Sequence, residues 1–415
     1  MRGTSVVAGL MDLPGVTVLG VSFGERDVTV DVKLRRRRLR CPYCEYVTWF
    51  RHDTRVVDST WGHLDLGRWG CVVRARLRRL RCPAHGVVTE QVPFARPGAR
   101  FTRDFEDLVA WLVTKMDKTA VCRLARIDWK TVGRIAERVT ADGLDADRLD
   151  GLVHIGVDEV AWKRGHSYLT LVADHVRGKI VWGTEGRDTA ALDGLFDELG
   201  PRRGAGIEAI SMDMGPAYAK SVAKPGHAPA AEVCVDPFHV VKLGTDALNT
   251  VRRSVWQEMR KVDPVRAKTF KGARWALLKN PQDLNDDQQA TLQRLRRRGG
   301  ELWRGYRLKE SLRAIFAGDL GIEEVAQLLD RWISQAQRSR LAPFVKAAKT
   351  VRKHRDRILA AIRLGINNGR CEGLNNVVRR IFNRAYGLHS PQAALALIQL
   401  CCGPIDLILP HERSP

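Results

Sequence analysis

Three carboxylates stand out because of the residues around them. Asp158 closes the apolar run LVHIGVD (152–158), and Asp213 closes the run IEAISMD (207–213). Glu372 lies far downstream in NNGRCEGLNNVVRRIFNRAYG (367–387), a helix-like segment otherwise rich in Asn, Arg and small residues. Carboxylate oxygens are the ligands that Mg²⁺ or Mn²⁺ prefers, and two such ions roughly 4 Å apart can clamp both oxygens of an in-line displacement at phosphorus. The three residues together predict metal-dependent phosphodiester chemistry, although an aspartate at a strand end is common in any α/β protein.

The charge of the chain favours a polyanionic partner. Its 415 residues include 69 Lys plus Arg against 47 Asp plus Glu, a formal net charge of +22. Such an excess favours nucleic acid through phosphate contacts and counterion release, with a generic basic protein as the alternative. No apolar run approaches the ~18–20 residues of a membrane span. The N-terminal residues lack a signal-peptide pattern, and nine irregularly spaced cysteines do not form a secreted disulfide framework. We therefore expect a cytoplasmic protein with no membrane partner.

Two short motifs, CPYC (41–44) and CPAH (82–85), predict a metal site. Each places two ligand-type side chains three positions apart in one tight turn, which fits tetrahedral Zn²⁺. The alternative is a pair of unrelated cysteine turns. The expected site is a structural zinc ribbon in an N-terminal DNA-binding domain (1–98), with the ligands Cys41, Cys44, Cys82 and His85.

Basic runs border this zinc motif, RRRRLR (35–40) and RARLRRLR (74–81). In the second run, strand alternation would put Arg74, Arg76 and Arg78 on one face, where they could follow a row of phosphates. A solvated charged face is the alternative.

Residues 99–145 change to helical periodicity. Thr102 is a candidate cap for a first helix, a short helix follows at roughly 119–125, and a third begins at Trp129 after a tight turn. This spacing predicts a helix-turn-helix domain in which Lys130, Arg134 and Arg138 face DNA. A plain helical connector is the alternative.

The elements after residue 150 define the expected catalytic core. Strands are expected at 152–158, within 167–186 (two), at 207–213 and at 231–236. With a helix at about 188–199 and another starting at Gly215-Pro216, they give the order β-β-β-α-β-α-β. This order predicts an α/β, ribonuclease H-like mixed sheet, with the first and fourth strands side by side and their aspartates at one edge. The core is expected to comprise 150–244 and 366–405, with an all-α insertion at 245–365.

The chain resembles the ISL-three family of bacterial insertion-sequence transposases. Four blocks in this order carry the resemblance, which extends from about Leu34 to about Leu400: IGVDEVAWKRGHSYLTLVAD, SMDMGPAYAKSV, VDPFHVVKL and NNGRCEGLNNVVRRIFNRAYG. The resemblance implies a DDE triad of Asp158, Asp213 and Glu372. It also implies a zinc ribbon whose fourth ligand is usually cysteine, so that the histidine at position 85 is a departure.

The resemblance implies further roles near the triad. Asp236 and His239 match a D-x-x-H element that would support the site; a helix cap and a packed histidine are the alternatives. The residues expected to contact DNA near the active site are Lys163, Asn375, Arg379 and Arg384.

The implied partners are double-stranded DNA, at terminal inverted repeats and target sites, and a second copy of the chain, because joining two ends needs more than one active site. The implied location is the nucleoid of a bacterial cytoplasm. Two other hypotheses stay open: a DNA-binding regulator, and a structure-specific nuclease or resolvase.

Overall fold

The computed structural model describes residues 3–163, 165–270, 272–318, 320–366, 369–385 and 387–413; it does not describe the side chains of residues 266, 269, 270 and 369–372. The internal contacts divide the chain into two units. The first comprises Met1–Asp145 with Arg379–Pro415, and the second comprises Ala146–Val378. Each unit is described by itself.

The first unit begins with a four-stranded sheet beside helix α1 (Gly3–Met11). Its strand order is β1 (Val16–Phe23), β2 (Asp27–Leu34), β7 (Trp69–Ala75) and β6 (Ser59–Leu66). Strand β2 reads DVTVDVKL, and its valines at 28, 30 and 32 are buried while the residues between them are not. This period of two is the reason that one face of the sheet packs against a core containing Trp61 and Phe94.

The two zinc motifs lie in the turns between shorter strands beside this sheet. These strands are β3 (Leu39–Arg40) paired with β4 (Val47–Thr48), and β8 (Arg78–Cys82) paired with β5 (Asp53–Thr54) and β9 (Gly86–Thr89). CPYC lies between β3 and β4, and CPAH lies at the turn from β8 to β9.

The expected row of arginines along one strand is wrong. Strand β7 ends at Ala75, and β8 begins at Arg78 in a different sheet, so Arg74, Arg76 and Arg78 do not share a strand face. Each guanidinium pairs with a different carboxylate, on Asp31, Asp58 and Glu90 respectively. Arg78 also donates to the backbone carbonyls at positions 36 and 37. The three arginine side chains therefore form separate local ion pairs, whereas strand alternation predicted one exposed row.

Three helices follow as the sequence predicts: α2 (Arg103–Lys115), α3 (Lys118–Ala125) and α4 (Trp129–Gly143). Each begins after a side-chain cap. Thr102 accepts from the amide of Phe105, Asp117 from that of Ala120, and Asp128 from those of Lys130 and Thr131. The predicted turn at Ile127–Asp128 falls between α3 and α4, where Arg126 takes the left-handed conformation with φ 55°.

The end of the chain returns to these helices. Helix α16 (Pro391–Cys402) packs against α4 and α2, and the hydroxyl of Thr140 donates to the carbonyl of Ala396 at 3.2 Å. A Cβ at Gly133, in the middle of α4, would lie 2.3 Å from the His389 ring, so glycine allows this close approach. The segment 366–405, expected from sequence to lie wholly in the catalytic core, is divided by the internal contacts after Val378.

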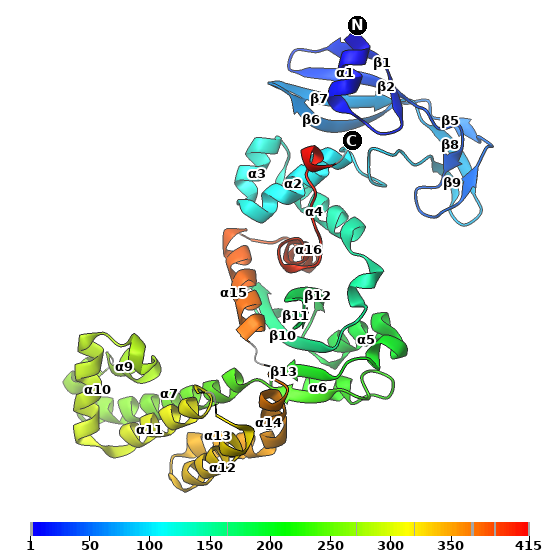
Figure 1. Cartoon of the computed structure of the whole chain (residues 1–415). Helices are drawn as coiled ribbons and strands as arrows, with labels where there is room; N and C mark the ends of the chain where they lie inside the picture. The colour runs from blue at the N-terminus through cyan, green and yellow to red at the C-terminus, as the bar shows by residue number, and fades with distance from the viewer. Residues whose placement is uncertain are drawn as a thin grey trace. The chain divides into compact units, whose positions relative to one another are not determined.

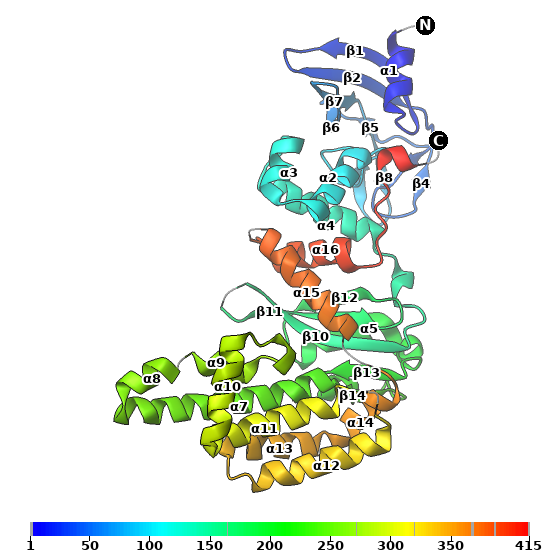
Figure 2. The same cartoon turned by 60° about the vertical axis from the view of Figure 1, so that its left-hand side comes forward.

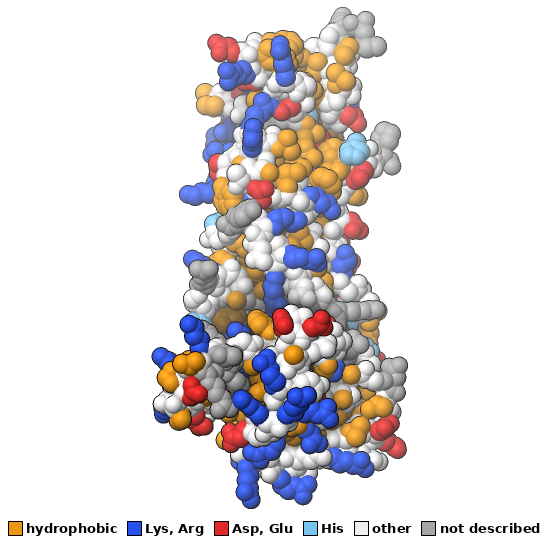
Figure 3. All heavy atoms as spheres, turned by 90° about the vertical axis from the view of Figure 1, so that its left-hand side faces the viewer, with side chains coloured by type: hydrophobic (Ala, Val, Ile, Leu, Met, Phe, Trp, Pro, Cys, Tyr) orange, Lys and Arg blue, Asp and Glu red, His pale blue; other side chains and the backbone are white. Residues whose placement is uncertain are grey.

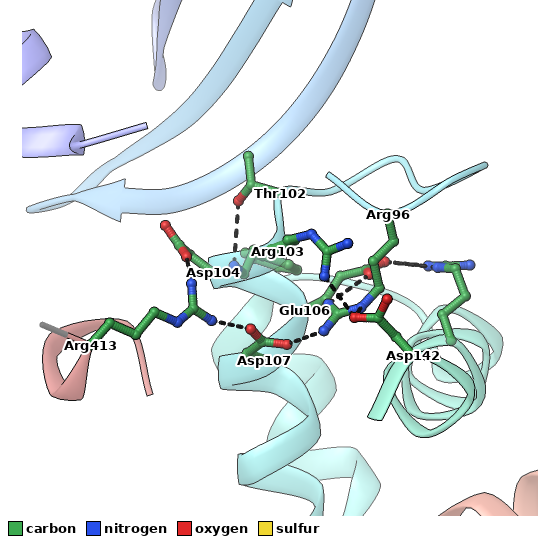
Figure 4. A network of polar contacts seen from close by, with 10 residues as sticks. Arg96, Thr102, Arg103, Asp104, Glu106, Asp107, Asp142 and Arg413 are labelled. Atoms are coloured by element: carbon green, nitrogen blue, oxygen red, sulfur yellow. Dashed lines mark hydrogen bonds and ion pairs between the residues drawn. The ribbon is translucent and has the colours of Figure 1, made fainter. Parts of the chain in front are cut away.

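A buried ion network ties α2 to the segments around it (Figure 4). Arg96 pairs with Glu106, Asp107 and Asp142, and Arg138 pairs with the fully buried Glu106. Arg413, close to the end of the short helix η3 (Pro410–Glu412), bridges Asp104 and Asp107. A buried charge needs a partner of opposite charge, because water is excluded around it. These ion pairs therefore hold the C-terminal segment against α2.

A five-stranded mixed sheet is the centre of the second unit (Figures 1 and 2). Its order is β12 (Lys179–Glu185), β11 (Ser167–Asp174), β10 (His154–Lys163), β13 (Ala209–Met212) and β14 (Glu232–Val235). Strands β10, β13 and β14 are parallel, and β10, β11 and β12 are antiparallel. The accompanying helices are η1 (Ala146–Leu149), α5 (Thr189–Gly204) and α6 (Pro216–Val222). The first and fourth strands of the sequence pattern, β10 and β13, are therefore neighbours, as expected.

Strand β10 extends further than the sequence predicts. It continues past Asp158 to Lys163 because its second half pairs with β11, with Asp158 opposite Leu171. The apolar run 152–158 includes the part of the strand that also pairs with β13, at residues 154–156.

The remainder of this unit is helical, as predicted for the insertion. Helix α7 begins at Pro237, inside the expected core, and continues without a break to Val262. The others are α8 (Pro264–Phe270), α9 (Ala273–Leu278), η2 (Pro281–Asp283), α10 (Asp286–Arg298), α11 (Gly300–Ile315), α12 (Ile322–Arg338), α13 (Ala342–Lys353) and α14 (Arg355–Arg363). They bury a second core around Trp332 and Phe344. Figure 3 shows Lys and Arg side chains over this helical part.

Helix α15 (Gly369–Arg384) follows the insertion and spans the boundary between the units. In the described part of the chain, no helix has the length and apolar character needed to cross a membrane.

Candidate active site and DNA-binding surfaces

Asp158 and Asp213 come together at one edge of the mixed sheet. Gly156 of β10 is in register with Ser211 of β13, and each aspartate lies two residues further along its parallel chain. Asp213 directly follows the last residue of β13, so its side chain belongs to the turn that leads into α6. The two predicted carboxylates are therefore neighbours, and two adjacent acidic groups at a strand edge can share a cation.

Backbone amides hold both carboxylates. Asp158 Oδ1 accepts from the amide of Glu159 at 2.7 Å, and Asp213 Oδ1 accepts from the amide of Gly215 at 2.8 Å. A Cβ on Gly215 would lie 2.8 Å from Asp213 Oδ1, too close for contact without movement. Glycine at this position lets the Asp213 carboxylate fold against the turn that follows it.

Asn375, on helix α15, orients the side chain of Asp158 on strand β10. Its Nδ2 donates to Asp158 Oδ2, and its side chain is buried, with 8% exposed. Asn375 is one of the residues expected from sequence to contact DNA; in the structure its side chain binds the first carboxylate. The side chain of Glu372 lies outside the described residues, while its backbone belongs to α15, three positions before Asn375.

If the Mg²⁺-dependent DNA cleavage expected from the sequence takes place at these carboxylates, Asn375→Ala should raise the Mg²⁺ concentration needed for half-maximal cleavage. Removing a residue that supports a metal ligand typically costs about 10- to 100-fold in metal affinity or activity. The measurement is cleavage rate against Mg²⁺ concentration. Asn383→Ala, at an exposed asparagine of the same helix, is the matched control. An unchanged Mg²⁺ dependence in Asn375→Ala would show that the contact with Asp158 has no positioning role.

Glu159 is an acidic residue that sequence reasoning passed over. Burial raises the pKa of its carboxyl; Arg187 opposes the rise, and the charges of Asp213 and Asp158 add to it. Burial also raises the pKa of Tyr218 to about 12, against its hydrogen bond with Thr170. The signal available in the sequence was the Asp-Glu pair itself, since a carboxyl next to Asp158 is affected by the same neighbouring charges.

The helical insertion brings His354 near Asp213. This histidine lies between α13 and α14 and is 7% exposed, and its Nδ1 has no hydrogen-bond partner among the described residues. Burial lowers its pKa, as do Arg357 and Lys353, while Asp213 acts in the opposite direction. Nothing in the local sequence KHRD indicated this proximity, because it depends on how the insertion folds back.

Asp236 takes the alternative role that the sequence left open. It caps α7, its Oδ1 accepting from the amide of Phe238 at 3.0 Å, and it is 3% exposed. His239 is half-buried, with its ring edge-on to Phe238, and it lies close enough to Glu159 to lower that carboxyl's pKa.

The four predicted zinc ligands form a compact cluster. The ligand atoms of Cys41, Cys44, Cys82 and His85 all lie within 4.8 Å of one another. The separations are 3.6 Å between the sulfurs of Cys44 and Cys82, and 3.5 and 3.7 Å from His85 Nδ1 to the sulfurs of Cys82 and Cys41. A tetrahedral zinc ion with Zn–S near 2.3 Å and Zn–N near 2.0–2.1 Å needs ligand atoms about 3.5–3.8 Å apart.

The electrostatics of Cys82 also suit a metal ion. Burial would raise the pKa of the Cys82 thiol, but the hydrogen bond with His85 and nearby backbone amides lower it to about 6. A thiolate is the form that binds metal. The histidine at position 85 therefore completes a donor set that fits zinc.

The expected DNA-contacting residues of the helix-turn-helix divide into two groups. Lys130 and Arg134 are exposed on α4. Arg138 is half-buried and donates twice to Glu106, at 2.9 and 2.6 Å, so its guanidinium belongs to the ion network. The C-terminal segment covers another face of α4, at Gly133 and Thr140.

The remaining predicted DNA contacts are more scattered. Lys163 is exposed at the far end of β10, five residues from Asp158. Arg379 is exposed on α15, and Arg384 is half-buried on the same helix, beside the Cys401 thiol.

A helix-turn-helix joined to an α/β domain with paired aspartates at a sheet edge is typical of an enzyme that acts on DNA. A family model described as a transposase, of the DDE type and the ISL3 family, matches residues 155–398, more than half of the chain. A second model, the helix-turn-helix domain of transposase family ISL3, matches residues 90–140. The chain belongs to the ISL3 family of DDE transposases.

Two relatives are similar over nearly their whole length. The transposase for insertion sequence element IS1557, from two strains of Mycobacterium tuberculosis, is 39% identical over 444 residues, covering 100% of this chain and 99% of the relative. The transposase for insertion sequence element IS1001 of Bordetella parapertussis is 27% identical over 368 residues, covering 87% of this chain and 88% of the relative. The resemblance inferred from sequence motifs is confirmed.

Proposed function

We propose that this transposase cuts and joins DNA at the terminal inverted repeats of its own insertion sequence, with Asp158, Asp213 and Glu372 as the catalytic triad. The observation that supports this most is the pairing of β10 with β13, which brings two predicted carboxylates to one sheet edge. The strand order β12-β11-β10-β13-β14 supports a ribonuclease H-like core. Glu372 is proposed from helical spacing, because residues three apart on a helix share a face and Asn375 reaches Asp158.

The residues fit divalent Mg²⁺ or Mn²⁺. The donors at the edge are carboxylate oxygens held by backbone amides and by an amide side chain, with no thiol or imidazole among the proposed triad. Two bound ions would supply charge stabilisation to the attacking and leaving oxygens of a direct transesterification. The protein's own contribution is positional: Asn375 and the Glu159 amide fix both oxygens of Asp158, and the Gly215 turn fixes Asp213.

DNA recognition is proposed for two surfaces of the first unit. Lys130 and Arg134 lie on the third helix of the helix-turn-helix, the element that usually enters the major groove. The zinc ribbon adds the exposed arginines of the run 35–40. Arg138 and the arginines at 74, 76 and 78 have carboxylate partners, so we assign them to structure. Joining two DNA ends also calls for at least a dimer, acting on the bacterial nucleoid.

A plasmid assay tests this function against its alternatives. A selectable marker flanked by the element's terminal repeats is supplied with the transposase, and excision and integration are scored. Both events are expected, and both should depend on Mg²⁺ or Mn²⁺. A regulator would bind the repeats without cleavage, and a resolvase would cut branched DNA without joining ends; either result would contradict the proposal.

A further inference from the structure

The zinc ribbon displays two adjacent aromatic side chains to solvent. Trp49 is 61% exposed and Phe50 is 85% exposed, in the loop between β4 and β5. Large aromatic rings are normally buried or half-buried, because each removes a large apolar area from water. Two consecutive exposed rings on a small ribbon therefore indicate a contact with something outside this unit.

The loop that carries these rings is held at both ends. On one side, Leu39 and Arg40 of β3 pair with Thr48 and Val47 of β4. On the other, the amide of His52 donates to the carbonyl of Arg79, directly before the β5–β8 pair. Inside the loop, the amide of Phe50 donates to the hydroxyl of Thr48 at 3.0 Å. The exposed rings are thus presented by a fixed backbone.

One arginine stacks on one of these rings, and others lie on the loop and strands next to them. The Arg38 guanidinium lies over the Trp49 ring, 4.6 Å from its centroid. We define the ribbon patch as the two rings together with exposed arginines on the adjoining strands and loop: Arg38, Arg40, Trp49, Phe50, Arg51 and Arg81. Among the described residues, no carboxylate forms an ion pair with any of these four arginines, unlike Arg74, Arg76, Arg78 and Arg79 nearby. The patch therefore combines flat apolar rings with uncompensated positive charge.

We propose that the ribbon patch binds unpaired DNA bases, which stack on Trp49 and Phe50 while the arginines contact the neighbouring phosphates. The proposal deepens the DNA-binding role proposed for the zinc ribbon. Bases in an intact duplex stack on one another and offer only their edges, whereas an unpaired base offers a face to an aromatic ring. Arg38 covers one face of Trp49, so a base on the other face would complete a three-layer stack.

A binding experiment with the full-length chain tests this proposal. Fluorescence anisotropy would compare a terminal-repeat duplex with the same duplex carrying an unpaired oligo-dT tail. The parent protein is expected to prefer the tailed probe. In the double variant Trp49→Ala/Phe50→Ala, affinity for the tailed probe should fall by roughly 5- to 150-fold per stacked base, while affinity for the paired probe stays unchanged. The conservative variant Trp49→Phe should keep most of the preference.

Controls separate stacking from misfolding and from the catalytic proposal. Phe23→Ala removes another exposed ring of the same unit, 72% exposed and outside the patch, and should leave the preference intact. A parent protein that binds both probes equally would overturn the inference, as would a double variant that loses affinity for both probes to the same degree. The outcome is independent of the triad, because binding is measured without Mg²⁺ and needs no cleavage.

Discussion

Replacing Asp158 with asparagine is expected to abolish strand cleavage and strand transfer while repeat binding persists. Asparagine keeps the size of the side chain but removes the negative charge that would hold a divalent ion beside Asp213. We expect a loss of more than about 100-fold, because losing a residue that merely supports a metal ligand already costs about 10- to 100-fold. The same result is expected for Asp213→Asn and Glu372→Gln. The measurement is single-turnover cleavage of a labelled terminal-repeat duplex, with anisotropy as the parallel readout of binding.

Asp356→Asn is the matched control for charge. Its carboxylate is 98% exposed on α14 of the same unit, so the variant removes one negative charge away from the sheet edge. It should cleave at the parental rate. Full strand transfer by purified Asp158→Asn would refute the triad.

Loss of the proposed zinc site is expected to unfold the ribbon and to weaken DNA binding. The apolar cluster beneath it contains only Leu39, Leu80 and two of the metal ligands, Cys41 and Cys82, as its buried members. A core of this size cannot stabilise a fold without a further constraint. A structural zinc ion supplies about 10–16 kcal/mol of apparent binding free energy at neutral pH. Cys82→Ser should therefore lose bound zinc, ribbon structure and much of the affinity for terminal repeats.

Metal analysis, proteolysis and anisotropy on the same preparation would check this result. Cys122→Ser, a half-exposed thiol on α3 outside the cluster, is the control and should retain zinc. If Cys82→Ser kept the parental zinc content and affinity, the metal site would not lie at these four residues. The zinc and triad variants affect different steps. Cys82→Ser should lose DNA binding, whereas the triad variants should keep DNA binding and lose only strand cleavage and transfer.

The helix-turn-helix shows what neighbouring residues in the sequence can predict. Thr102, Asp117 and Asp128 cap its three helices, and each cap is a side chain bonding to an amide two or three residues ahead. Because each of these interactions joins residues at most three positions apart, the boundaries of the three helices could be predicted closely from the sequence. The ion pair of Arg138 on the same domain could not be predicted in this way, because its partner Glu106 lies on another helix.

The sequence by itself determined the order of the elements, the neighbouring places of β10 and β13, the four members of the metal cluster and the family. Residue types, short spacings and periodicity specify the elements and the two metal motifs, and the order of the elements, matched to a known fold type, implies that β10 and β13 are neighbours. Only the tertiary structure decided that Asn375 binds Asp158, that His354 lies near Asp213, and that the C-terminal helix packs on the helix-turn-helix. These contacts join residues far apart in the chain, and they depend on how whole elements pack.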